Sequence, residues 1–201
     1  MAVTERSHTE SPARERIITS AYELFAKRGV RDVGVDELIR HSGVAISTFY
    51  RHFRSKDDLV LAFLERREQV WTLGILESEA RRRGKTPTGR LLAIFDVFDE
   101  WFQRDDYEAC SFVNVLLEMG SENPIGRASI AYLGHIRDFT RRLGEEAGLR
   151  NLDDFVWSWH ILMKGSIISA AEGDRTAALR AKRIGALVID QLSGDPVGLT
   201  L

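Results

Sequence analysis

A group of hydrogen-bonding side chains lies close together in the first third of the chain. Ser47, Thr48 and Tyr50 carry hydroxyl groups. Arg51 follows with a guanidinium and His52 with an imidazole. Such groups bind phosphate oxygens and the edges of bases in nucleic acids. They would also suit a helix that binds a protein partner, so the residue types alone leave both interpretations open.

The cysteine and the histidines show no pattern typical of a catalytic or metal site. The five histidines have no short ligand spacing, and Cys110 has neither a second cysteine nor an adjacent base. The sequence contains no phosphate-cradling glycine loop and no nucleophile elbow. We therefore expect no cofactor, no metal and no enzymatic activity. The alternative is a helical enzyme that binds a small molecule, with chemistry near Cys110 or His135.

Apolar residues at helical spacing predict an all-α fold that positions these groups. The first third should form helices over 12–28, 35–42 and 45–53, with Gly43 between the two short ones. Ser11 and Gly34 are the expected N-caps of the first two helices. A long helix should then follow Ser55, which precedes a carboxylate by three residues, and run to residue 83.

Two short helices separated by a glycine and supported by an amphipathic helix are typical of a helix-turn-helix unit. Its second short helix enters the major groove of DNA, which is wide enough for one helix. The apolar residues that should face inward are Leu38, Ile39, Val44, Phe49 and Phe53. The residues left on the outer surface are Ala45, Ile46, Ser47, Thr48, Tyr50, Arg51 and His52.

The same segment resembles a known family. Residues 24–30, 35–38 and 42–44 contribute, and above all the run Thr-Phe-Tyr-Arg-His-Phe-Arg-Ser-Lys-Asp-Asp-Leu at 48–59. Together they resemble the TetR/AcrR family of transcriptional regulators. The resemblance spans about residues 14–60. It implies a homodimer that binds a palindromic double-stranded operator with two such heads and leaves it when a small molecule enters the body.

By this resemblance Thr48, Tyr50 and Lys56 should contact phosphates, with Arg51 and His52 near the edge of the groove. The complete set of expected DNA-binding residues is Gly34, Val35, Ala45, Ile46, Ser47, Thr48, Tyr50, Arg51, His52 and Lys56.

Four of these positions depart from the family pattern. Gly34 stands where a threonine usually caps the second helix. Ala45 and Ile46 replace a common serine and a polar residue, and Ser47 replaces a common glycine. We therefore hypothesise that Ile46 packs against a thymine methyl group and that Ser47 adds a hydrogen bond.

The net charge of −2 is the sum of a basic first part of the chain and an acidic remainder. Up to Lys56 the chain has ten Lys and Arg against seven Asp and Glu, which leaves the remainder at −5. A mildly basic head on an acidic body is compatible with DNA binding, although mixed charge runs usually form a solvated surface. The arginines at 81–83 should complement the end of a helix dipole, with a phosphate-binding patch as the alternative.

Five more helices are expected, over about 87–102, 111–119, 124–148, 151–173 and 174–192, which makes about nine in all. We expect residues 1–56 to form the helix-turn-helix DNA-binding domain with a flexible N-terminus. Residues 57–201 should form a helical effector-binding and dimerisation domain with a frayed tail from Ser193.

The central helices are rich in aromatic residues. Aromatic stripes at helical spacing are usually core, but the resemblance implies an apolar effector cavity between these helices, and ligand pockets combine apolar walls with a few polar groups. His160 is one polar candidate. The expected ligand-binding residues are Phe95, Phe98, Phe102, Asn114, Glu118, His135, Phe139, Trp159 and Met163.

Small residues lie four apart along the last two helices, where two backbones could approach closely. The family dimer is a four-helix bundle of these helices, so we expect a C2 homodimer through about 153–192. Its expected contact residues are Leu162, Ser166, Ser169, Ala181, Ile184, Gly185 and Val188.

The resemblance implies a ligand-responsive transcriptional repressor, and the aromatic content suggests that its inducer is a small apolar or aromatic compound. A single cysteine and a polar N-terminus without a signal-peptide core favour the reducing cytoplasm. No stretch of eighteen apolar residues occurs, so we expect no membrane span.

Overall fold

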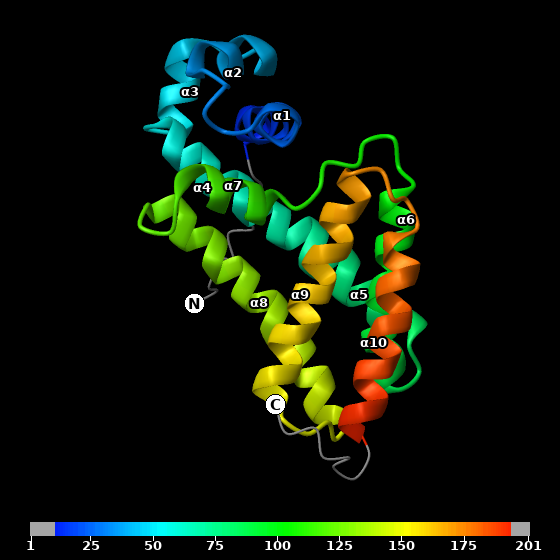
Figure 1. Ribbon diagram of the computed structural model, residues 1–201. Helices are drawn as coiled ribbons and strands as arrows, with labels where there is room; N and C mark the ends of the chain where they lie inside the picture. Colours follow the sequence, from blue (N-terminus) through cyan, green and yellow to red (C-terminus); the bar gives the residue numbers. More distant parts are fainter. Residues whose placement is uncertain (1–10, 194–201) are drawn as a thin grey trace, which may run out of the picture. The chain divides into compact units, whose positions relative to one another are not determined.

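The computed structural model describes residues 11–193, and within them every regular element is a helix (Figure 1). The all-α expectation is confirmed. The expected flexible N-terminus and the tail beyond Ser193 lie outside the described residues. The first elements are α1 Pro12–Arg28, α2 Val35–Ser42, α3 Ile46–His52 and α4 Lys56–Arg67.

The chain divides into two compact units between Arg66 and Arg67. The sequence placed this boundary earlier, after Lys56. The boundary falls in one uninterrupted helical run, which continues through η1 (Glu68–Glu77) and α5 (Ser78–Arg83). With this run taken as one helix, the described residues contain nine helices, as the sequence predicted.

The N-terminal unit is built around α1, which packs against α2 and α3. Ile17, Ile18, Ala21 and Phe25 recur at helical spacing and are buried. Phe63 of α4 meets Phe25 edge to face, with 5.7 Å between the ring centroids. Such aromatic pairs add stability beyond the area that they bury.

Local hydrogen bonds and glycine geometry fix where these helices begin and end. The backbone N–H of Asp58 donates to the hydroxyl of Ser55 at 3.1 Å, so the predicted cap of α4 is confirmed. Gly43 ends α2 with φ of 62°, a left-handed conformation that glycine adopts without strain. Ser11 is the N-cap of α1 and Pro12 its first residue, as predicted, but the Ser11 hydroxyl makes no capping bond and lies 3.5 Å from His52 Nε2.

The long helix is not a regular α-helix throughout. Its middle section, η1, is a π-helix, which the sequence did not predict. Glu68, Thr72 and Leu76 are buried within it at intervals of four residues. The apolar pattern alone could not reveal this, because two of the three inward-facing side chains are polar. π-helical segments occur frequently at functional sites.

The C-terminal unit adds α6 (Pro87–Phe102), α7 (Ser111–Met119), α8 (Pro124–Glu146), α9 (Leu152–Ala171) and α10 (Ala177–Ser193). Figure 1 shows α10 beside α9 and α6, and these three helices pack together. Helix α8 packs against both α9 and α7. Helix α5 packs against α6. No helix within residues 11–193 is long and apolar enough to cross a membrane.

The arginines at 81–83 have partners in the C-terminal unit. Arg82 and Arg83 both hydrogen-bond to Glu79, and these contacts hold the pKa of Glu79 at about 2. Arg83 also bonds Glu100 through two nitrogens at 2.8 and 2.7 Å. The guanidinium of Arg81 lies over the ring of Phe139. These contacts favour a structural role at the helix end over a phosphate-binding patch.

Candidate functional site

Helix α3 exposes most of its side chains to solvent. Phe49 is its one buried residue, and the ring lies against Tyr50 and Phe53. Ile46 is 64% exposed and Tyr50 is 50% exposed. Ser47 and Arg51 are exposed as well. One aromatic anchor therefore holds a short helix whose outer surface is accessible to a partner.

The inward and outward positions follow the sequence prediction closely. Of the residues expected inside, Leu38, Ile39, Phe49 and Phe53 are buried and Val44 is half-buried. The residues expected outside are exposed or half-exposed: Ala45, Ile46, Ser47, Thr48, Tyr50, Arg51 and His52.

The other expected DNA-binding residues border this helix in sequence. Lys56 opens α4 and is half-exposed. Gly34 is the exposed, extended N-cap of α2, as predicted, and Val35 begins that helix half-buried. Helix α3 itself contains no acidic residue, and its last turn carries Arg51 and His52. Its surface can therefore donate hydrogen bonds to an anionic partner without like-charge repulsion from its own side chains.

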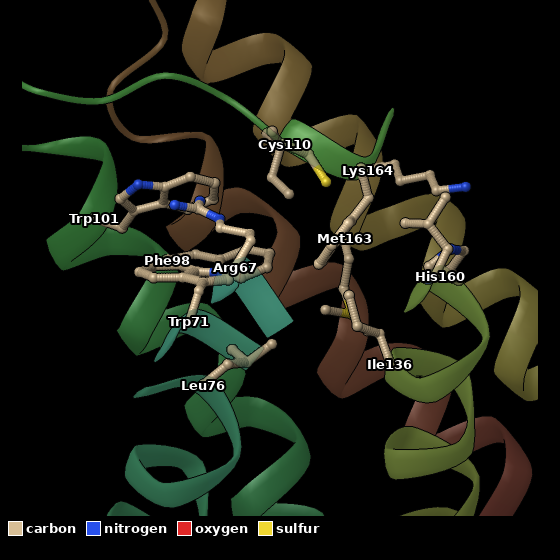
Figure 2. A pocket seen from close by; sticks show the side chains of 13 residues that line it. Arg67, Trp71, Leu76, Phe98, Trp101, Cys110, Ile136, His160, Met163 and Lys164 are labelled. Atoms are coloured by element: carbon tan, nitrogen blue, oxygen red, sulfur yellow. The ribbon is translucent and has the colours of Figure 1, made fainter. Parts of the chain in front are cut away.

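A second candidate site is a cavity of about 30 Å³ within the C-terminal unit (Figure 2). It has room for on the order of one or two water molecules. Side chains from several helices line it: Arg67, Trp71, Leu76, Phe98, Trp101, Cys110, Phe112, Leu133, Ile136, His160, Met163, Lys164 and Ile167. The walls are mostly aromatic and aliphatic, with few polar groups, which is typical of small-molecule sites.

One side of the cavity is formed by Arg67 and two tryptophans. Arg67 is only 6% exposed, and its guanidinium lies 4.9 Å from the ring centroid of Trp71 and 5.6 Å from that of Trp101. The centroids of the two indole rings are 4.4 Å apart. Cation–π contacts of this kind hold a buried guanidinium in an otherwise apolar wall.

The other side carries His160, Met163 and Lys164 of α9 (Figure 2). Burial lowers the pKa of His160 to about 3, with added repulsion from Lys164 and Arg137, so its imidazole is neutral near pH 7. Its Nε2 lies 3.5 Å from Arg137 Nη1. Its Nδ1 is buried and has no hydrogen-bond partner among the described residues. Burial also lowers the pKa of the half-buried Lys164.

The two residues considered for enzymatic chemistry lie in different surroundings. Cys110 lines the cavity, and burial raises the pKa of its thiol, which disfavours the reactive thiolate. His135 does not line the cavity; its Nδ1 lies 2.9 Å from Glu68 Oε1. Among residues 11–193, no three His, Cys, Asp or Glu side chains gather as metal ligands would.

The cavity brings together two of the nine residues expected to bind a ligand, Phe98 and Met163. Phe95 and Trp159 instead pack on each other with 5.3 Å between ring centroids. The other five expected residues do not line the cavity either: Phe102 and Phe139 are fully buried, Asn114 and His135 are exposed, and Glu118 is half-exposed.

Sequence reasoning missed the charged cavity residues. Arg67 and Lys164 both line the cavity, and Lys164 stands among apolar neighbours on its helix, which was the available signal. His160 was recognised only as a polar candidate. Which helices meet around a cavity depends on tertiary packing, which the helical period does not reveal.

The last two helices carry the expected dimer contacts on two different faces. Ser166, Ala181 and Gly185 are buried within the protomer. A Cβ atom at Gly185 would lie 2.8 Å from Trp159. The missing side chain at this glycine therefore leaves room for the Trp159 indole of the same chain. Leu162, Ser169 and Val188 are half-exposed, and Ile184 is 50% exposed.

The exposed face of these helices is apolar. Its large side chains are Trp157, Ile161, Ile168, Leu179, Ile184 and Leu187. A groove of about 270 Å³ lies on this face between α9 and α10, lined by Ser158, Trp159, Ile161, Leu162, Ile184 and Val188. Apolar surface of this kind commonly marks a protein–protein interface.

Comparison with known proteins relates this arrangement to a family. Residues 17–63 match the family model "Bacterial regulatory proteins, tetR family". The HTH-type transcriptional repressor NemR of Escherichia coli K12 is 27% identical over 113 residues, which are 56% of this chain and 56% of NemR. The HTH-type transcriptional activator FasR of Mycolicibacterium smegmatis is 32% identical over 92 residues, 46% of this chain and 41% of FasR. The chain thus spans about half the length of the curated relatives it matches.

Solved structures share the fold over almost the whole chain. A TetR-family transcriptional regulator from Streptomyces coelicolor has a TM-score of 0.83 at 23% identity, covering 90% of this chain and 96% of that one. The reduced form of E. coli NemR has a TM-score of 0.71 at 19% identity, covering 92% and 100%. Identities this low establish the fold alone. Residues 17–63 are therefore similar in sequence to the TetR family of bacterial regulatory proteins, and the chain shares the fold of solved TetR-family regulators.

Proposed function

We propose that this protein is a homodimeric, sequence-specific DNA-binding regulator of transcription. The observation that carries the proposal is the exposed surface of α3, where Ser47, Tyr50 and Arg51 lie outside a single buried anchor, Phe49. A short helix in a helix-turn-helix unit reads the major groove with side chains of this kind. Regulation of transcription would place the protein with the DNA, in the cytoplasm.

Affinity and specificity would come from different residues of this surface. Thr48, Tyr50 and Lys56 would bind phosphates, and so would Arg51 at the edge of the groove. These contacts position the helix but carry no sequence information. Ile46, with 64% of its surface exposed, has no polar atom on its side chain. Apolar contact with a thymine methyl group is the recognition available to it, and Ser47 would add a hydrogen bond to a base edge or a phosphate.

A second copy of the chain would cover the apolar face of α9 and α10. Exposed Ile161, Ile184 and Leu187 lie on these neighbouring helices and would be buried by a twofold-related copy. Two heads related by this symmetry would bind two half-sites of a palindromic operator.

We further propose that the regulator is a repressor released by a small ligand in the cavity. Typical ligand sites occupy about 300–1,000 Å³, so the cavity of about 30 Å³ must enlarge to accept one. Enlargement would move the surrounding helices, and a ligand that binds only the enlarged state would shift the equilibrium away from the DNA-binding state. The relatives include one named a repressor and one named an activator, so the direction of regulation needs its own test.

Selection of binding sites from random duplex DNA tests the function directly. We expect an inverted repeat to be enriched. Ile46→Ala should relax the preference at one base pair of each half-site, whereas the control Leu117→Ala, at an exposed position on α7, should leave it unchanged. Failure of the wild-type protein to enrich any sequence would refute sequence-specific binding. An unchanged preference in Ile46→Ala would refute the thymine contact.

A further inference from the structure

We propose that the ligand of the C-terminal cavity is an organic carboxylate, with an apolar or aromatic body and one anionic group. This inference rests on the proposed function, because it names the chemical class of the ligand for the same cavity. It depends on three features of the lining: its charge balance, an unpartnered hydrogen-bonding atom, and its aromatic surface.

The charge balance of the lining is positive. Arg67 and Lys164 contribute a guanidinium and an ammonium, and none of the thirteen lining residues is Asp or Glu. The half-buried ammonium of Lys164 lies beside apolar walls and loses part of its hydration, and an opposite charge in the cavity would compensate that loss. A carboxylate would supply that compensation to Lys164, whereas a neutral or cationic ligand would not.

Of the two cavity cations, Arg67 and Lys164, an opposite charge in the cavity would stabilise Lys164 more. Arg67 lies against two tryptophans. The hydrogen bond from Arg104 lowers the pKa of Asp106, and the nearby charge of Arg67 adds to that lowering. Among the described residues, by contrast, no carboxylate lies within ion-pair distance of the Lys164 ammonium. The nearby charge of Arg137 is also positive.

His160 provides the second, independent observation. Only 3% of this residue is exposed, it lines the cavity, and its Nδ1 has no partner among the described residues. Arg137 can only donate to Nε2, so the neutral ring carries its proton on Nδ1. A buried N–H without an acceptor is costly, and a carboxylate oxygen is a strong acceptor for it.

The aromatic surface determines the rest of the ligand. Figure 2 shows Trp71, Phe98 and Trp101 beside Arg67, opposite Met163 and His160, with the Lys164 amino group on the His160 side. A ligand between these walls would place an apolar or aromatic body against the rings and its carboxylate toward Lys164 and His160. Because the cavity is small, compact aromatic acids are the appropriate first probes.

The experiment compares each acid with its uncharged amide of nearly the same shape. The pairs are benzoate with benzamide and phenylacetate with phenylacetamide, titrated calorimetrically into the full-length protein. A hydrogen bond to a charged group is stronger than a neutral one, so at least one acid should bind about tenfold more tightly than its amide. Lys164→Met should abolish most of this preference, because it removes the charged donor and keeps an unbranched side chain, and it should leave amide binding within about twofold.

Matched controls separate a specific effect of the Lys164 charge from a general loss of positive charge or of folding. Lys85→Met removes an exposed cation outside the cavity and should keep the full preference for the acid. Circular dichroism of each variant checks that the helices remain folded; if Lys164→Met fails to fold, His160→Leu should reduce the preference in its place.

Equal affinity of acid and amide in both pairs, or no measurable binding of either acid, would overturn the proposal. Duplex DNA binding without any compound is measured on the same protein. Loss of the proposed function is therefore distinguishable from loss of the carboxylate preference.

Discussion

Helices α3 and α9 carry candidate functional residues in opposite ways. Helix α3 has seven residues and buries only Phe49, so its candidate residues face solvent. Helix α9 buries eight of its twenty residues, and His160 and Met163 face the cavity. A neighbouring face of α9 exposes Trp157, Ile161 and Ile168. One helix thus offers a single exposed surface, whereas the other lines a cavity and also presents an apolar outer face.

The two kinds of site depend on different information. The surface of α3 needs only one buried anchor and a short continuous run of residues. The cavity needs Arg67, Trp101 and Lys164, which come from three different helices. Local sequence therefore determines the first site, and tertiary packing determines the second.

The largest expected effect tests whether the buried face of α10 packs within one subunit rather than between two subunits. In Gly185→Arg the new Cβ atom would lie 2.8 Å from Trp159 and 3.3 Å from Phe95, and the substitution would bury a charge. Overpacking and charge burial together should lower the free energy of unfolding by more than about 4 kcal/mol in urea denaturation. Gly165→Ala, with no atom within 4 Å of its new methyl group, should instead stabilise by about 0.5–1 kcal/mol. A stable, folded monomer from Gly185→Arg would place Gly185 between subunits and contradict its packing against Trp159.

Two adjacent residues sharpen the comparison within α3. Phe49→Ala removes a fully buried ring and should cost about 3–5 kcal/mol in the free energy of unfolding. Tyr50→Ala removes a half-exposed ring that meets Phe49 edge to face and should cost only about 1 kcal/mol while weakening DNA binding. Chemical denaturation and fluorescence anisotropy with labelled duplex measure the two effects. Equal loss of stability in both variants would show that Tyr50 belongs to the core rather than to an outer surface.

The outer face of α9 and α10 is tested by a charge at its exposed edge. Leu187→Asp affects both copies of a twofold interface, at about 1.5 kcal/mol each, so the dimer dissociation constant should rise about 100-fold. Sedimentation velocity over a concentration series measures this change. The matched control is Leu117→Asp, which places the same charge on an exposed apolar position of α7. A dimer that Leu187→Asp does not weaken would exclude this face.

The smallest expected effect concerns His160. Its pKa is about 3 in the folded protein against an ordinary value of 6.5, so protonation below pH 6.5 favours the unfolded chain. The stability is complete above pH 6.5 and falls with decreasing pH, by at most about 1.4 kcal/mol per pH unit from this residue. Urea denaturation between pH 7 and 5.5 should show a shallower decline for His160→Leu than for the wild type. Parallel declines would show that His160 titrates normally in the folded protein.

Much of the fold follows from sequence because its signals are local. The first three helices match their predicted ranges within one residue at each end, and Gly43 and Ser55 act as predicted. The sequence did not predict the π-helix η1, because two of its three buried residues, Glu68 and Thr72, are polar and give no apolar pattern. The small residue Gly185 was assigned to a subunit contact, whereas the structure packs Trp159 of the same chain there.

The proposed recognition of DNA would depend most directly on phosphate contacts made by the N-terminal unit. The decisive measurement is the salt dependence of duplex binding by the wild type, Lys56→Gln and Arg51→Gln, with Lys85→Gln as the control. Each phosphate contact contributes about −0.9 to the slope of log affinity against log salt, and a dimer with two heads makes each contact twice. Each of the two variants should therefore reduce the slope by about two, and the control should not. Salt-independent binding, or a slope that neither Lys56→Gln nor Arg51→Gln changes, would contradict DNA recognition by α3 and the start of α4.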